Sequence, residues 1–127
     1  MLIPYWIQRS DFTATDHDPV DADQAVNDFL GYDWEGEDRL FDELDQRSED
    51  NCSAGFGLFT DDGRRLHVCR HDNGMFFFFY DRKVKLLGIF PYSKSEASAK
   101  MTAAEAAEAI RRFFDGDHEW LMSKRRG

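Results

Sequence analysis

The chain has 127 residues, of which 42% are hydrophobic and 15% aromatic, and its formal net charge is −9 at pH 7. This composition is typical of one globular domain, residues 1–127, and argues against a disordered chain. No apolar run approaches the roughly 20 residues of a membrane span, and MLIPYWIQRSDF lacks the basic start of a signal peptide. A cytoplasmic protein is therefore expected, with Cys52 and Cys69 as reduced thiols.

Charge is distributed unevenly along the sequence. Residues 1–62 contain 17 acidic and 3 basic residues, whereas residues 63–127 contain 8 and 13. The acids are densest in residues 21–50, with 12 acidic and 2 basic residues. Such a surface either keeps the protein soluble or attracts a basic partner. Direct binding to nucleic acid is disfavoured, because phosphate contacts require lysine and arginine.

The N-terminal half predicts an arm followed by acidic helices. Residues 1–20 form an irregular arm that has room for a short edge strand at IPYWIQ. Residues 21–47 form an acidic helical region, in which Asp21 or Asp23 caps the first helix and Gly31 interrupts the pattern.

Residues 54–90 predict an antiparallel sheet. Strands are expected at 54–60, 64–70, 75–80 and 84–90, separated by the turn sequences DDG, HDNG and DRK. Short turns between strands favour a four-stranded meander. The Ser/Lys-rich segment 93–100 is expected to be a loop.

The C-terminal helix is predicted at 102–115. Thr102 and Glu105 fit a capping box, in which each side chain satisfies a backbone N–H of the other residue. Residues 121–127 are expected to form a frayed basic tail. The predicted fold is α+β, a four-stranded antiparallel meander with the N-terminal helices and the C-terminal helix packed on one face.

The sequence FFFFY at 76–80 raises a question about the sheet. In a strand, Phe76, Phe78 and Tyr80 point to one face, while Phe77 and Phe79 point to the other. The strand is then either buried on both faces or has a second face left for a partner. The N-terminal arm and the Trp120 segment are the two parts of the chain that could cover this second face.

The sequence predicts no catalytic or metal-binding site. His67, Cys69 and His71 alternate on one strand, but the first and last are about 13 Å apart at the strand rise, too far for one tetrahedral zinc. No nucleophile elbow, phosphate-binding loop or zinc-protease motif is present. The protein is therefore expected to be no enzyme and to bind no cofactor and no metal.

The candidate partner-binding site lies in and around YDWEGED. An aromatic ring among carboxylates is typical of a charged interface, because the ring supplies buried area and the acids pair with basic residues of the partner. The alternative is that Tyr32 and Trp34 pack into the core between the first two helices. The predicted partner-binding residues are Asp33, Trp34, Glu35, Glu37, Asp38, Asp42, Glu43 and Asp45.

Two longer segments carry a resemblance to a known family. GLFTDDGRRLHVCRHDNGMFFFFYD and MTAAEAAEAIRRFFDGDHEWL resemble the immunity proteins of bacterial polymorphic toxin systems, in particular those found beside nucleic-acid deaminase toxins. The likeness covers about residues 55–120. The positions that match the family's pattern are Leu66, Val68, Ala106, Ala109, Phe113 and Trp120.

The resemblance implies a cytoplasmic antitoxin without catalytic residues, which binds one toxin's catalytic domain and covers its basic substrate-binding surface. Such a protein is expected to be a monomer or weak homodimer that contacts neither nucleic acid nor membrane. Two alternatives remain. One is a non-enzymatic adaptor or self-associating domain. The other is a small enzyme or metal-dependent sensor that uses His67, Cys69 and His71.

Overall fold

The computed structural model describes the backbone of residues 1–86 and 90–124 and the side chains of residues 1–82 and 99–124. Strands and helices alternate in blocks along the chain. They are β1 (Ile3–Gln8), β2 (Ala14–Val20), α1 (Ala22–Gly31), α2 (Trp34–Gln46), β3 (Gly55–Phe59), β4 (Arg64–Arg70), the 3₁₀ turn η1 (Asp72–Gly74), β5 (Phe76–Leu86), β6 (Phe90–Met101), α3 (Ala103–Phe114) and α4 (His118–Ser123).

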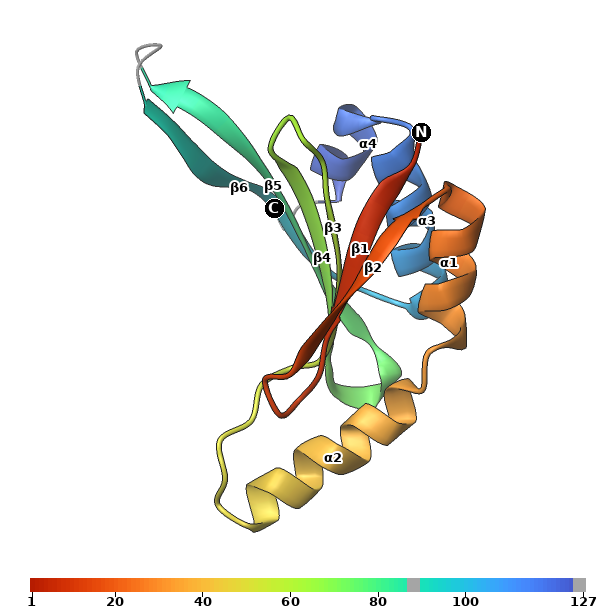
Figure 1. Cartoon of the computed structure of the whole chain (residues 1–127), viewed down its shortest axis with the longest axis vertical. Helices are drawn as coiled ribbons and strands as arrows, with labels where there is room; N and C mark the ends of the chain where they lie inside the picture. The colour runs from red at the N-terminus through yellow and green to blue at the C-terminus, as the bar shows by residue number, and fades with distance from the viewer. Residues whose placement is uncertain (87–89, 125–127) are drawn as a thin grey trace.

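The strands form one six-stranded antiparallel sheet in the order β2-β1-β3-β4-β5-β6 (Figure 1). The α+β class is confirmed, but the prediction of four strands is wrong. The N-terminal arm supplies both additional pairings, β1 with β2 and β1 with β3, because Ile3, Tyr5 and Ile7 alternate toward the core and Tyr5 lies opposite Leu58 of β3. Tyr5 and Leu58 are about fifty residues apart in the sequence, so no short turn between the two strands predicts their pairing.

The C-terminal side of the sheet also differs from the expectation. β5 runs without interruption through DRK, with a register shift between Tyr80 and Asp81, and β6 occupies the segment expected to be a loop. A register shift of this kind bends a strand without ending it. β6 is an edge strand, and edges accept the serine and lysine residues that a central strand would exclude. Part of the expected strand 84–90, residues 87–89, lies outside the described residues.

The helices begin where capping residues stand. Asp21 and Asp33 each accept a backbone N–H at the start of α1 and α2, within the predicted acidic helical region. Both hydrogen bonds of the predicted Thr102–Glu105 capping box are present at α3. The expected C-terminal tail is partly helical, because α4 covers His118–Ser123, while residues 125–127 lie outside the described part. Among the described residues, no helix has the length and apolar character to cross a bilayer.

The helices α1, α3 and α4 lie on one side of the sheet, and the core lies between them and the strands (Figure 1). Phe76, Phe78 and Tyr80 of β5 are buried there, with Phe29 of α1 and Phe113 of α3. α2 departs from the predicted packing. It passes the end of the sheet instead of covering its face (Figure 1), because its first residue, Trp34, reaches the core while most of its other residues are polar.

The opposite side of the sheet carries the other half of the FFFFY segment. We define the open face as the described side chains on this side, and no described helix packs on it (Figure 1). Phe79 is 36% exposed, so of the two alternatives left by the sequence, burial of the strand on both faces does not describe it. β1 and β2 lie within the sheet, and Trp120 packs against the helix-covered core, so neither covers Phe79. The open face includes Trp6, Gln8, Ala14, Asp16, Gly55, Gly57, Phe59, Arg65, His67, Cys69, Phe77, Phe79, Asp81 and Lys100.

Gly57 makes room for the aromatic ring of Trp6. The two residues are directly opposite each other in neighbouring strands, and a Cβ atom at Gly57 would overlap the indole ring. We expect Gly57→Ala to lower the free energy of unfolding by about 1–3 kcal/mol, because the ring has to move. Urea denaturation measures this change.

Gly31→Ala is the matched control, because no atom lies within 4 Å of the position its Cβ would take. At the end of α1, alanine should leave the stability unchanged or raise it by up to about 1 kcal/mol. Equal destabilisation by both substitutions would contradict the role of Gly57.

Candidate functional site

The acidic helix α2 is anchored by the buried carboxylate of Glu37, which is 3% exposed. Its Oε2 atom accepts hydrogen bonds from Arg9 Nε at 2.9 Å and from the Tyr32 hydroxyl at 2.7 Å. Its Oε1 atom accepts one from the backbone N–H of Ser10 at 3.1 Å. A buried charge is tolerated when it is paired and hydrogen-bonded in this way. Glu37 therefore fixes α2 to the end of β1, and its carboxylate is paired with groups of the same chain.

Tyr32 supports the same anchor. Burial, and next the hydrogen bond to Glu37, raise the pKa of Tyr32 to about 12. The phenol thus keeps its proton at neutral pH and donates it to the carboxylate. Among the described residues, no buried side-chain nitrogen or oxygen lacks a hydrogen-bond partner, as expected for a structural polar cluster.

A second anchor lies one residue further along α2. Arg70, at the end of β4, donates from Nε to Asp38 Oδ1 at 3.1 Å and from Nη2 to Asp38 Oδ2 at 3.0 Å. This two-pronged geometry is the strong form of an arginine–carboxylate pair. The guanidinium also lies over the ring of Phe76, 5.0 Å from its centroid. Asp38 therefore connects α2 to the sheet.

Trp34 belongs to the core. Its side chain is 7% exposed, its Nε1 donates to the carbonyl oxygen of Phe29 at 2.8 Å, and its ring meets Phe76 edge-on at 5.2 Å. Of the two alternatives left by the sequence, core packing describes its position. The ring does not project among the surface acids.

The remaining predicted site residues are exposed on α2 or at its start. Asp33 caps the helix and lies 3.8 Å from Arg39, and Glu43 pairs with Arg47 at 3.5 Å. Glu35, Asp42 and Asp45 have no ion pair within the part of the chain that the structure describes.

These acids share one side of the helix. Residues that recur at intervals of three and four lie along one stripe of a helix. We call Glu35, Asp38, Asp42 and Asp45 the acidic stripe of α2. Within it, Asp38 alone has a basic partner among the described residues, so the stripe keeps an excess of negative charge.

A cavity of about 290 Å³ lies beside the acidic stripe, between α2 and the turn after β4. Its lining is rich in carboxylates and includes one guanidinium. From the sequence, this turn, HDNG, is expected only as a connection between strands, and no local pattern predicts Arg70 and Asp72 as neighbours of the acids. The charged residues of the lining are Glu37, Asp38, Asp42, Arg70 and Asp72.

His67, Cys69 and His71 do not converge. Cys69 Sγ lies 3.5 Å from His67 Nδ1 on the open face, whereas His71 follows the end of the strand. Burial lowers the pKa of His67 and raises the pKa of Cys69 to about 11. Both cysteines are free thiols. Within the described residues, no group of three His, Cys, Asp or Glu side chains could hold a metal ion.

The anchoring role of Glu37 can be tested against a neighbour on the same helix. We expect Glu37→Ala to lower the free energy of unfolding by about 3 kcal/mol, because it leaves buried donors of Ser10 and Tyr32 without an acceptor. Glu35→Ala should change it by no more than about 0.5 kcal/mol, because Glu35 is exposed. Chemical denaturation gives both values.

Hydrogen exchange adds a local measurement. Loss of the anchor should speed exchange of the α2 amides more than that of the α3 amides. Equal stability of the two variants would show that Glu37 does not hold α2 in place.

Comparisons with other proteins assign no function to this site. The chain matches no protein-family model, no curated protein and no solved structure. A functional proposal for this chain therefore rests on the acidic stripe, the adjoining cavity and the way α2 is anchored.

Proposed function

We propose that this protein is an inhibitor of the immunity type, which binds the catalytic domain of a toxin acting on nucleic acid and covers its basic substrate-binding surface. The observation that carries the proposal is the acidic stripe: Glu35, Asp42 and Asp45 are exposed and have no ion pair among the described residues. Such a surface attracts the lysine and arginine residues with which a toxin binds phosphates.

The stripe has an energetic cost in the isolated protein. Like charges three and four residues apart on a helix each destabilise it by roughly 0.2–0.5 kcal/mol. Asp42 and Asp45 are such neighbours, whereas Arg70 offsets the charge of Asp38. Basic residues of a partner would relieve this repulsion, so the same feature that weakens α2 alone favours a complex.

The cavity beside the stripe suits a cationic side chain. Its volume of about 290 Å³ is at the lower end of the range for small-molecule pockets, and its charged lining is mainly acidic. We propose that an arginine or lysine of the partner enters it between Asp42 and Asp72. The bound cation would add a buried, charge-assisted contact to the exposed pairs along α2.

The anchors of α2 favour tight binding. Glu37 and Asp38 hold the helix before any partner arrives, so little conformational entropy is lost on association. The net charge of −9 would steer a basic domain toward the protein and raise the association rate. In this role the protein acts in the cytoplasm, where the toxin meets its substrate.

A charge-reversal pair tests the proposal. If a gene for a toxin acting on nucleic acid lies beside this one, the variant Asp42→Lys/Asp45→Lys should bind the catalytic domain of that toxin at least about tenfold more weakly than the wild type, with most of the change in the association rate at low salt. Surface plasmon resonance with the purified domain measures both rates.

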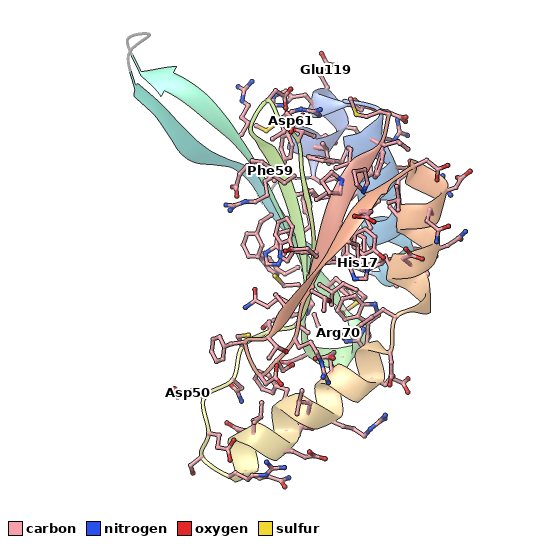
Figure 2. The ribbon with its side chains drawn as sticks, in the orientation of Figure 1. His17, Asp50, Phe59, Asp61, Arg70 and Glu119 are labelled. Atoms are coloured by element: carbon pink, nitrogen blue, oxygen red, sulfur yellow. The ribbon has the colours of Figure 1, made fainter. Side chains whose placement is uncertain are left out.

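The control carries the same change of charge at the other end of the molecule. Figure 2 shows Asp61 and Glu119 at the end opposite Asp50, the residue that follows α2 by four positions, and both control residues are exposed. Asp61→Lys/Glu119→Lys should retain most of the affinity. If both variants lose affinity equally, net charge and not the acidic stripe determines binding.

A further inference from the structure

Phe12 has a backbone conformation that is unfavourable for its side chain. It lies in the turn that joins β1 to β2, and its φ of 71° falls in the left-handed region. In that region a Cβ atom crowds the backbone, so bulky residues are rarely found there. The other non-glycine residues with positive φ in the described part of the chain, Ser48 and Asn73, have small polar side chains. Phe12 therefore places a large aromatic ring where glycine or asparagine is favoured.

The turn needs this backbone conformation but not this side chain. The backbone N–H of Arg9 donates to the carbonyl oxygen of Thr13 at 2.7 Å, and that of Phe12 donates to the carbonyl oxygen of Arg9 at 3.1 Å. The Asp11 carboxylate accepts the backbone N–H of Thr13 at 3.1 Å. Hairpins with a three-residue loop commonly end that loop on a left-handed residue, for which glycine is the usual choice. Glycine at position 12 would therefore close the hairpin with less strain.

The ring of Phe12 contributes little to the fold. The residue is 55% exposed. Within the described residues, it belongs neither to the hydrophobic core nor to the partly buried side chains that pack against the core. The residue costs stability in two ways, because its backbone is strained and its apolar ring meets water. A costly side chain that the fold does not use indicates a role in contact with another molecule.

The turn that carries Phe12 lies beside the acidic helix. Ser10, two residues before Phe12, donates its backbone N–H to the carboxylate of Glu37 in α2. Ser10 also lines the cavity to which Asp38 and Asp42 of the acidic stripe contribute. In Figure 1, the turn between β1 and β2 lies at the end of the sheet that α2 passes. One approaching molecule can therefore contact the turn and the acidic stripe together.

We propose that Phe12 is the aromatic anchor of the toxin complex, and that its ring enters the site in which the toxin's catalytic domain holds a base of the nucleic acid. The inference rests on the proposed function and adds the apolar contact to it. Surfaces that bind single-stranded nucleic acid combine a basic groove for the phosphates with aromatic side chains on which the bases stack. The acidic stripe is complementary to the groove, and an exposed flat ring is complementary to the base site.

The charges around Phe12 favour this partner over others. Asp11, the residue before it, is exposed and has no ion pair among the described residues. An apolar surface without basic residues would bury this carboxylate without a partner, which costs free energy. A second copy of the chain would be repelled, because each copy has a net charge of −9. A pocket surrounded by lysine and arginine accepts both the ring and the neighbouring acids.

Phe12→Gly should change stability and binding in opposite directions. Because glycine relieves the left-handed strain, the midpoint of urea denaturation should rise by up to about 0.5 M. Because the ring is lost, the variant should bind the catalytic domain of the toxin at least about tenfold more weakly, mainly through faster dissociation in surface plasmon resonance. A lower urea midpoint would show that the ring supports the fold, and would overturn the inference without any toxin.

Two further variants test whether the ring occupies a base site. Phe12→Tyr keeps a flat ring and should bind within about threefold of the wild type, because a base site favours planar groups. Phe12→Leu keeps apolar character without a flat ring, and should bind at least about fivefold more weakly. Equal affinities of these two variants would overturn the assignment to a base site.

Phe59→Ala is the control, because it removes another exposed phenyl ring, at 41% exposure. Figure 2 shows Phe59 at the end of the molecule opposite Asp50. This variant should keep its affinity within about twofold, because surface substitutions away from a contact have small effects.

Salt dependence separates the anchor from the acidic stripe. The loss caused by Phe12→Gly should be the same at low and high salt, whereas the loss caused by Asp42→Lys/Asp45→Lys should shrink as salt screens the charges. If only Phe12→Gly weakens binding, the acidic stripe is not the interface and the anchor stands. If only the charge reversal weakens binding, the anchor is overturned and the proposed function stands. A wild-type protein that does not bind the toxin domain would overturn both.

Discussion

The buried carboxylate of Glu37 is the constraint on which the functional part of this structure depends. It accepts hydrogen bonds from Arg9, Ser10 and Tyr32, and so joins the end of β1, the linker between the first two helices and α2 itself. Because these groups satisfy both carboxylate oxygens, α2 has one direction relative to the sheet. The acidic stripe takes its position from that direction. A single buried charge thus determines where a group of exposed charges can act.

The strand β5 divides the molecule in a different way. Its alternation sends Phe76, Phe78 and Tyr80 into the core and Phe77 and Phe79 to the open face. One strand therefore supplies both the interior and an aromatic surface. The helices α1, α3 and α4 cover the first side, and no described helix packs on the second. Exposure of apolar area to water costs free energy, and we therefore expect a binding role for this surface.

The sequence predicts those parts of the fold whose chemistry lies within a few residues. The capping box of Thr102 and Glu105 and the cap at Asp21 fall within single helical turns, so the starts of α1 and α3 are predicted. The strand at IPYWIQ was expected only at an edge, because the place of β1 inside the sheet depends on pairing with Leu58 of β3, far along the chain. β6 was missed for another reason, because an edge strand tolerates the serine and lysine residues that also mark loops.

For the candidate site too, the sequence predicts local spacing but not the distant partners of each residue. The spacing of the acids in α2 is visible in the sequence, but the partners that distinguish them are not, since Glu37 needs Arg9 and Asp38 needs Arg70. Trp34 likewise belongs to the core only because Phe76 is there to receive it. An acidic segment by itself is weak evidence for a basic partner, because some of its carboxylates already pair with basic residues of the same chain. In α2, three exposed acids on one side of the helix have no ion pair among the described residues. An approaching molecule therefore meets their negative charge.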